Sequence, residues 1–416
     1  MSRKPGCKIT KALEKAHPIS RGNCLRCKGA KLLCGYQTCP LLRKLAPVKA
    51  SSEKLTRELS GPSPSIFIGW GGWPNVSVGQ LTGLDYEKTQ FSDDPSKWYG
   101  LGFDDIIGLR SNLVRSKKKQ DVKTPTRFME NLQEIALSVK TVDTESFFQN
   151  KPKPTLEFNP ISQPMGPTGV LKKLRVTDNP KIPHKVEYIL GDELTASTQL
   201  NKLYKAGFDV YYLTQALSCG ATGLSENKKI VPTRWSITAV DDMIAKKQMQ
   251  RIRDYPQLSE TLVYENTYLE NHFEVLLLPG AWEFELFEAW SPNTLWTQKQ
   301  KETVIQVEYE KHSGRTKYAF NEGGGYYAGR VAVTGALDEM RRQAQVVVIR
   351  EIYDSYVVPV GVWEVRENVR AALKNKHKKF KNRGEALEDM QKRLNIPVKN
   401  YMDKSNILTQ KKITDF

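Results

Sequence analysis

The sequence predicts an α+β protein, with a mixed, largely antiparallel sheet as its body and a small N-terminal module that contains four cysteines. The chain has 416 residues, of which 39% are hydrophobic and 26% charged, which is typical of a globular protein with two or three domains. From residue 186 onwards, stretches with strand-like and helix-like patterns alternate. Five of the six cysteines lie within the first 39 residues, in a segment too polar to form its own core.

The first half of the chain has fewer regular patterns than the second. A β-prone run at residues 66–68 enters a turn rich in glycine and tryptophan, and residues 104–142 have a mostly helical pattern that is interrupted at Lys117–Lys119 and Pro125. Residues 150–183 contain seven prolines. Because proline disrupts both helices and central strands, we expect a long irregular crossing there, with a boundary inside the body.

The second half predicts a regular succession of strands and helices. We expect strands at Val186–Leu190, Phe208–Leu213, Val304–Glu310, Val346–Tyr353 and Val357–Val365, and a hairpin that pairs Leu262–Leu278 with Ala281–Trp290. We expect helices at Ala196–Lys205, through Met243 to Ile252, at Ala336–Ala344, through Val369 and Leu373, and at Glu385–Leu394. The predicted regions are a basic zinc-binding module (1–60), a mixed helical and irregular region (61–180), an α+β core domain (181–396) and a flexible tail (397–416).

The net charge of +17 belongs to the two ends of the chain. Residues 1–60 carry 14 Lys or Arg against 3 Asp or Glu, and residues 366–416 carry 14 against 6, so the 305 residues between them total −2. Basic ends beside a nearly neutral body are the pattern expected of a protein that meets nucleic acid, although lysine-rich ends also increase solubility. No apolar run is long enough to span a membrane and no N-terminal signal region is present, so we expect a cytoplasmic protein without a membrane partner.

The N-terminal cysteines have a spacing typical of a metal site. A C-x₂-C pair is followed by two further cysteines after gaps of six and four residues, which makes the predicted ligands Cys24, Cys27, Cys34 and Cys39. Four thiolates at this spacing can close a tetrahedron around a structural Zn²⁺, and an iron–sulfur cluster takes the same ligands. Cys7 is then a spare, and His17 a substitute ligand. We interpret the module as a folding element first and a nucleic-acid contact second.

Two stretches combine residue types that are common in binding sites. Trp70-Gly71-Gly72-Trp73 offers flat rings for stacking on bases, although two tryptophans can equally cap a core. A candidate phosphate or nucleotide site consists of a glycine-rich segment and a distant arginine, which are Gly323, Gly324, Gly325, Arg330 and Arg234. Glycine loops are also ordinary turn chemistry.

Late in the chain, the sequence offers two carboxylates, a cysteine and a run of basic residues. Glu351 and Glu364 are possible catalytic carboxylates without a recognisable partner, and Cys219 is more consistent with a buried small residue than with a nucleophile. A basic run with an interleaved aromatic predicts phosphate contacts through Lys374, Lys376, Lys378, Lys379, Lys381 and Arg383. Its alternative is a solvated helix face.

The last seven residues have the pattern of a peptide that another protein binds. Gln410 is followed by Ile413 and Phe416 at intervals of three, a spacing that places the two apolar side chains on one side of a 3₁₀ turn. The pattern is similar to the motif with which replication and repair proteins bind the sliding clamp PCNA, except that the second aromatic of many such motifs is missing. Residues 397–409 before it are polar and predict a flexible tether.

Taken together, four features of this sequence resemble the archaeal Nre family of DNA repair proteins. These are the Cys24–Cys39 cluster, the Trp-Gly-Gly-Trp segment, the stretch from Arg350-Glu351-Ile352-Tyr353 to Val362-Trp363-Glu364, and the tail from Gln410 to Phe416. The resemblance spans nearly the whole chain. It implies a role in the response to DNA damage, contact with the clamp through the tail, and a metal site at the four cysteines.

Two functions from different classes follow from these observations. The first is an accessory DNA repair factor that the clamp recruits to DNA, with nucleoid association while it is clamp-bound. The second is an enzyme that acts on DNA or on a nucleotide, either a nuclease or a transferase with a nucleotide cofactor such as NAD. The resemblance implies no reaction, so no catalytic residue is assigned.

Overall fold

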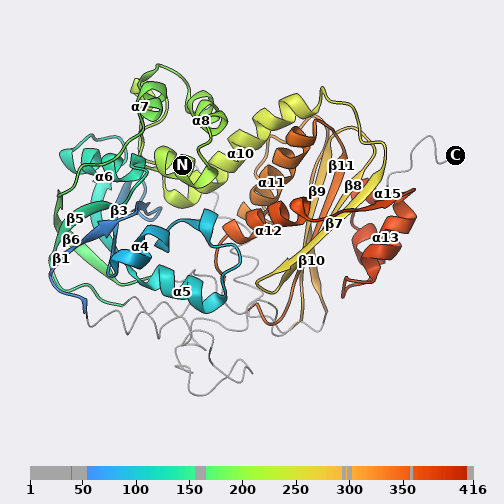
Figure 1. Ribbon diagram of the computed structural model, residues 1–416, viewed down its shortest axis with the longest axis horizontal. Coiled ribbons are helices and arrows are strands. Elements are labelled where there is room, and N and C mark those ends of the chain that lie inside the picture. The colour runs from blue at the N-terminus through green and yellow to red at the C-terminus, as the bar shows by residue number, and fades with distance from the viewer. Residues whose placement is uncertain are drawn as a thin grey trace, which may run out of the picture. The chain divides into compact units, whose positions relative to one another are not determined.

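The computed structural model describes residues 39, 54–154, 165–292, 297, 302–356 and 359–409, which form two compact units. The N-terminal unit contains residues 54–154 and 165–244, and the C-terminal unit contains residues 245–409; the division falls inside helix α10 (Thr233–Ile252), between Ile244 and Ala245. Figure 1 shows that each unit is built on its own sheet. We had expected a boundary in the proline-rich crossing, and the sequence did not indicate a division within a helix.

The N-terminal unit has a six-stranded sheet with the strand order β1-β5-β6-β4-β3-β2. Its strands are β1 (Glu58–Ser63), β2 (Ser65–Ile68), β3 (Asn75–Gly83), β4 (Leu113–Asp121), β5 (Val142–Phe148) and β6 (Thr168–Val176). β4 and β6 pair in parallel, and the other neighbouring strands are antiparallel. Buried positions alternate along β5, as expected for a sheet with one face on the core and one in solvent.

The N-terminal unit also contains helices, of which the one at residues 127–137 packs on β2 and β3 of this sheet. They are α4 (Tyr86–Ser92), α5 (Phe103–Ser111), α6 (Arg127–Leu137), α7 (His184–Gly191), α8 (Ala196–Lys205), α9 (Val210–Ser218) and the first part of α10. Met129, Leu132 and Ile135 of α6 pack with Val76 and Val78 of β3 in one apolar cluster. Burial of such side chains, worth about 1.5–3 kcal/mol each, holds helix and sheet together.

The C-terminal unit has a second six-stranded sheet with the order β10-β9-β11-β8-β7-β12, in which β9 and β11 are parallel. Its strands are β7 (Thr261–Tyr268), β8 (Asn271–Leu278), β9 (Glu283–Trp290), β10 (Val304–Glu310), β11 (Gln345–Ile352) and β12 (Lys378–Phe380). Helices α11 (Gly324–Met340) and α12 (Trp363–Lys374) lie on one face, and α13 (Arg383–Gln391), α14 (Val398–Met402) and α15 (Asn406–Thr409) on the other (Figure 1).

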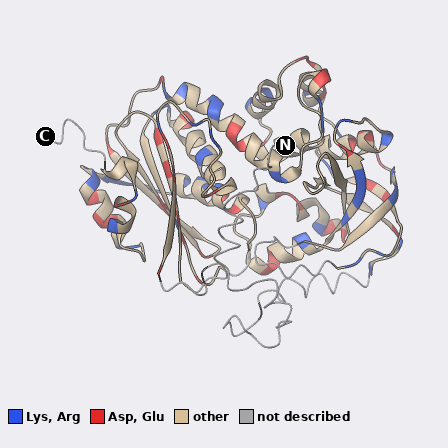
Figure 2. Cartoon of the chain, turned by 180° about the vertical axis from the view of Figure 1, so that it is seen from behind, with Lys and Arg blue, Asp and Glu red and all other residues tan. Residues whose placement is uncertain are grey.

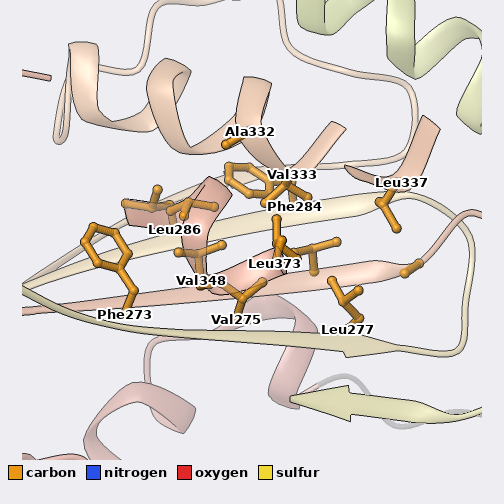
Figure 3. Close-up of a cluster of buried hydrophobic side chains, with 14 of the residues drawn as sticks. Phe273, Val275, Leu277, Phe284, Leu286, Ala332, Val333, Leu337, Val348 and Leu373 are labelled. Carbon is orange, nitrogen blue, oxygen red and sulfur yellow. The ribbon is translucent and has the colours of Figure 1, made fainter. Parts of the chain in front are cut away.

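Both faces of this second sheet are therefore buried. Every residue of β8 is buried, which explains the apolar run that forms its second half, Val275–Leu278. On one face, Phe273 and Val275 of β8 and Leu286 of β9 meet Val333 of α11 and Leu373 of α12 (Figure 3). The predicted α+β class, with mixed and mostly antiparallel sheets, is thus confirmed. The predicted zinc module lies almost wholly outside the described residues.

Several predicted elements were wrong for identifiable reasons. Val186–Leu190 and Phe208–Leu213 were expected as strands, but they form α7 and the start of α9. A short apolar run does not distinguish a strand from a helix. Asp209 caps α9, because its side chain accepts hydrogen bonds from two backbone N–H groups. Lys117–Lys119 lie on strand β4 rather than in a break within a helix. Part of Val357–Val365, expected as a strand, begins helix α12 at Trp363.

The predicted hairpin at Pro279–Gly280 was also wrong. β8 and β9 do not pair with each other, because β11 lies between them and bonds to both. The hairpin is instead β7–β8, and its two turn residues, Leu269 and Glu270, have positive φ angles. β11 comes later in the sequence than β8 and β9 and lies between them in the sheet, whereas the local sequence pattern had predicted that β8 and β9 pair with each other.

The segment before the tail is folded, although we had expected a flexible tether at residues 397–409. Its side chains Val398, Tyr401, Ile407 and Leu408 are buried in the apolar cluster that covers the second face of the C-terminal sheet.

None of the helices that the structure describes is long and apolar enough to cross a membrane.

Candidate nucleic-acid interface

The turn between β2 and β3 presents tryptophan to solvent. Its backbone is closed by a hydrogen bond from the Asn75 N–H to the Gly72 carbonyl at 2.9 Å. Gly72 has a φ of +84°, and a Cβ there would lie 2.8 Å from the Asn75 carbonyl oxygen, so this position needs glycine. Trp70, which precedes this turn, is 57% exposed.

The start of α10 brings a second tryptophan to the same turn. Trp235 is 45% exposed, and its ring centroid lies 5.2 Å from that of Trp73, at an interplanar angle of 50°. The helix start is fixed to the sheet because the backbone N–H of Ile68 donates to Thr233 Oγ1 at 3.0 Å. Trp73 and Trp235, 162 residues apart in the sequence, therefore pack against each other. Together with Trp70 of the same turn, we call them the tryptophan surface (Trp70, Trp73 and Trp235).

Basic side chains flank the tryptophan surface. Arg234 is exposed beside Trp235, and Lys119 is exposed on β4, the strand that pairs with β3; its neighbour Lys118 instead lies over the Phe128 ring, 4.7 Å from the centroid. The Lys119 amine lies against the turn, where it donates to the Asn75 carbonyl at 3.5 Å. Figure 2 shows basic residues on the strands of this unit.

One carboxylate lies at the same end of the sheet. Asp121 of β4 pairs in register with Asn75. Backbone N–H donation from Lys123, reinforced by Thr124, lowers the pKa of Asp121, so it is ionised at neutral pH. The surface is therefore predominantly but not wholly basic.

This arrangement suits single-stranded nucleic acid. Every base has a flat face that can stack on an exposed indole, and Lys and Arg nearby can neutralise phosphates without reading the sequence. The sequence left open whether these tryptophans stack on bases or cap a core. Trp73 is partly packed on the core, whereas Trp70 and Trp235 are exposed. The sequence indicated the Trp70–Trp73 segment and Arg234 as candidates, but it did not predict that the two stretches meet.

The predicted basic run 374–383 does not form a helix face. It includes the end of α12, strand β12 at the sheet edge, and the start of α13. Lys378 bonds to Asp389 at 3.0 Å and Lys379 to Glu260 at 2.7 Å, whereas Lys374, Lys376 and Lys381 are exposed. Arg383 is the first residue of α13. Two of the six predicted phosphate contacts thus already have carboxylate partners.

The predicted nucleotide site is divided between the two units. Arg234 is in the N-terminal unit, and the glycines are in the C-terminal unit. Gly323 caps helix α11, and Gly324 and Gly325 are its first residues. Arg330 is fully buried inside the unit and donates to Glu310 at 2.5 Å. A carboxylate, Glu288, also lies against the glycines, which disfavours a phosphate there.

The two carboxylates that the sequence offered as catalysts have different environments. Glu351 is buried and accepts hydrogen bonds from the backbone N–H groups of Asn395 and Ile396 and from the Tyr401 hydroxyl, so it holds local structure. Glu364 lies on α12 rather than on a strand. Burial raises its pKa to about 7, although the Arg350 guanidinium opposes the shift. Neither the nuclease nor the transferase prediction is tested by these contacts.

The remaining predicted sites concern cysteines and the tail. Cys24, Cys27 and Cys34, together with Cys7 and His17, lie outside the described residues, as do the clamp-binding residues Gln410, Ile413 and Phe416. Cys39 is described and half-buried. No group of three or more His, Cys, Asp or Glu in the described part of the chain is arranged to hold a metal ion.

Cys219 is a buried small residue, as predicted. Its thiol donates to the Ala216 carbonyl, and burial raises its pKa to about 12. A thiol that stays protonated at neutral pH is a poor nucleophile.

The fold and this surface together define a class: a two-unit α+β protein with an aromatic and basic surface suited to nucleic acid. Comparison with known proteins then gives the family. The model described as archaeal Nre, N-terminal, matches residues 33–297, and the model described as archaeal Nre, C-terminal, matches residues 310–416. The chain belongs to the archaeal Nre family, as its resemblance in the sequence predicted.

Curated relatives cover most of the chain. DNA repair protein NreA of Archaeoglobus fulgidus is 38% identical over 89% of this chain and 93% of its own length. DNA repair protein NreB of the same organism is 32% identical over 93% and 97%, and DNA repair protein NreA of Haloferax volcanii is 33% identical over 86% and 88%. No solved structure shows significant similarity to the chain.

Proposed function

We propose that this protein acts in DNA repair by contacting DNA through its tryptophan surface and by binding the sliding clamp PCNA through its C-terminal residues. The observation that carries the DNA contact is the pairing of Trp73 with Trp235 at 5.2 Å beside exposed Trp70 and Arg234. The names of the curated relatives support the choice of DNA repair. Repair exposes unpaired bases, which are the ligands that exposed indoles recognise.

Alanine substitution of the exposed tryptophans tests this contact. Stacking of a base on an aromatic side chain contributes about 1–3 kcal/mol. Trp70→Ala or Trp235→Ala should therefore weaken binding of a single-stranded oligonucleotide by about 5- to 150-fold, measured by fluorescence anisotropy. Tyr188→Ala is the matched control, because Tyr188 is 66% exposed in the same unit but on α7. Equal affinities for all three variants and the parent protein would refute the contact.

The clamp contact gains a geometric constraint from the folded segment 397–409. Helix α15 is held to the sheet because Glu285 accepts hydrogen bonds from the Ser405 hydroxyl and from the backbone N–H groups of Asn406 and Ile407. Gln410 follows Thr409, the last residue of α15, directly. A clamp bound at Gln410, Ile413 and Phe416 would then be close to the C-terminal unit rather than at the end of a long tether.

Deletion of residues 410–416 tests the clamp contact. The truncated protein should lose binding to purified PCNA in isothermal titration calorimetry, with a thermal unfolding midpoint close to that of the full chain. The double substitution Ile413→Ala and Phe416→Ala should have the same effect, and Lys411→Ala, which leaves both apolar side chains in place, is its control. Undiminished binding after the deletion would exclude this contact.

We also propose that Cys24, Cys27, Cys34 and Cys39 bind one structural Zn²⁺. Four closely spaced thiolates support this proposal through their chemistry, and an iron–sulfur cluster is its chemical competitor. Metal analysis of the purified protein, together with its visible absorption spectrum, separates the two. One zinc per chain without visible absorption is expected, and loss of the zinc in Cys27→Ser, but not in Cys219→Ser, would assign it to the cluster.

A further inference from the structure

One face of the N-terminal sheet presents basic side chains on two neighbouring strands, β4 and β6. The two strands pair in parallel, with Lys117 opposite Val170. Val170 is 51% exposed, so this part of the face is open to solvent. Because side chains alternate along a strand, Lys119 lies on the same face as Lys117, and Lys119 is exposed.

A β-bulge in β6 adds a further lysine to this face. The pairing of β6 with β5 shifts between Phe147 and Phe148, so that Lys172 is an extra residue and Lys173 lies opposite Phe147. In a regular strand Lys172 and Lys173 would point to opposite faces, yet both are exposed, and the leucines before and after them are buried. The bulge therefore gives the open face two adjacent lysines.

An aromatic ring lies beside these lysines. Phe147 of β5 is half-buried, and the Arg175 guanidinium lies over its ring, 5.4 Å from the centroid. Arg175 also forms an exposed ion pair with Glu145 at 3.5 Å. Lys172 and Lys173, by contrast, form no ion pair with any residue in the described part of the chain. Their charges are therefore available to a ligand.

Acidic side chains mark one border of this face. The strands beyond β6 are β5 and β1, which carry Asp143, Glu145 and Glu58. In the register of the sheet, Glu145 lies opposite Arg175. Glu58 lies opposite Phe147 in the same way, so these carboxylates are on the same side of the sheet as the basic residues. A negatively charged ligand would be attracted to β4 and β6 and repelled from the edge at β1.

Lys119 connects this face to the tryptophan surface of the same unit. Its amine donates to the Asn75 carbonyl at 3.5 Å, and a Cβ on Gly72 would lie 3.3 Å from the same amine. Neighbouring strands are about 4.8 Å apart, so β6 lies about 10 Å from β3, the strand that follows the tryptophan-bearing turn. The lysines of β6 are therefore within reach of the phosphates of a strand whose bases stack on the indoles.

We propose that Lys119, Lys172, Lys173 and Arg175 form a phosphate track, the basic sheet face, along which single-stranded DNA extends from the tryptophan surface. The inference rests on the proposed function and adds to it the path of the bound strand. Charge complementarity selects the occupant, because cations spaced along two strands can neutralise successive phosphates without reading any base edge. The exposed indoles beside the track favour a single strand, whose bases are free to stack on them.

Salt titrations of a double variant test the track. The probe is a labelled oligothymidylate of about 16 nucleotides, the upper end of common single-strand site sizes, observed by fluorescence anisotropy with the full-length protein. Each phosphate neutralised in a single strand contributes about 0.7 to the slope of log affinity against log salt. Lys172→Ser with Lys173→Ser should therefore reduce this slope by about 1.4. Between about 50 and 200 mM salt, the variant should lose about 7-fold less affinity than the parent protein.

Lys185→Ser with Lys205→Ser is the matched control. These lysines are exposed in the same unit on α7 and α8, and the double substitution changes the net charge by the same amount. The salt slope of this control should equal that of the parent protein. Because all four lysines are exposed, both double variants should keep the thermal unfolding midpoint of the parent.

Two outcomes would overturn the inference. One is the same salt slope for the parent protein and both double variants. The other is displacement of the probe by oligoglutamate of equal length with comparable affinity, because the face would then bind acidic polypeptides as readily as DNA. The proposed stacking contact is judged separately: Trp70→Ala and Trp235→Ala leave these charges in place, so they should lower affinity without changing the salt slope.

Discussion

The anchoring of the C-terminal segment by a buried carboxylate can be tested by Glu351→Ala. Glu351 of β11 is 1% exposed and accepts three hydrogen bonds at 2.9 Å, from the N–H groups of Asn395 and Ile396 and from the Tyr401 hydroxyl. These donors connect α13 to α14 and begin the segment that precedes the clamp-binding residues. Alanine would leave all three without their acceptor.

The magnitude follows from the number of bonds. A hydrogen bond to a charged group contributes about 1.5–3 kcal/mol, and an unpaired buried donor costs a similar amount. Because water can enter the space left by the side chain, the total should be less than three such bonds, so we expect about 3–5 kcal/mol. Tyr401→Phe removes one bond alone and should cost about 1–2 kcal/mol.

Urea unfolding and hydrogen exchange measure these effects. The free energy of unfolding should fall in the order parent, Tyr401→Phe, Glu351→Ala, and backbone amides of residues 397–409 should lose protection in Glu351→Ala. Glu260→Ala is the control, because Glu260 is half exposed in a surface ion pair with Lys379 and should change stability by less than about 1 kcal/mol. A Glu351→Ala protein as stable as the Glu260→Ala protein would refute the proposed anchor.

Three further outcomes are expected. Cys219 should resist alkylation by iodoacetamide at pH 8 in the native protein, because burial raises its thiol pKa to about 12; rapid labelling of that residue would contradict its placement. Burial raises the pKa of Glu364 from 4.5 to about 7, so the folded state holds the extra proton between these values and stability should fall by up to about 3 kcal/mol as pH rises through that window. Urea unfolding of Glu364→Gln should show a smaller decline, and an unchanged one would exclude this role. Arg234→Ala should weaken binding of single-stranded DNA and reduce the slope of its dependence on salt by about 1, whereas an unchanged slope would remove Arg234 from the interface.

The sequence predicted correctly the helices and strands that have a long hydrophobic pattern or clear local start and stop residues. Helix Ala196–Lys205 has the predicted bounds, and β10 and the strand β11 lie within one residue of them. The predictions for Val186–Leu190 and Phe208–Leu213 were wrong because a run of five or six mostly apolar residues fits a buried strand and one helical face equally well.

The candidate sites depend on contacts between residues that are far apart in the sequence, and a local sequence pattern does not predict such contacts. Trp73 and Arg234, the neighbour of Trp235, were both named as candidates from the sequence, but only the fold brings the rings of Trp73 and Trp235 together. Arg330 had the residue type of a phosphate ligand, yet burial against Glu310 gives it a structural role.

The segment 397–409 illustrates how a polar sequence can be folded. Its few apolar side chains fill the second face of the sheet, and carboxylates from β9 and β11 accept hydrogen bonds from the backbone N–H groups of Asn406 and Ile407 and from the Tyr401 hydroxyl. The acceptors are more than 40 residues away in the sequence, so composition alone predicted a tether.

The proposed DNA contact is tested most directly by photochemical cross-linking of single-stranded DNA to the full-length protein, with the cross-linked residues identified by mass spectrometry. The account predicts cross-links at Trp70, Trp73 or Trp235 that a competing unlabelled strand abolishes. Cross-links confined to the basic run 374–383 or to residues 1–53, with none on the tryptophan surface, would contradict it.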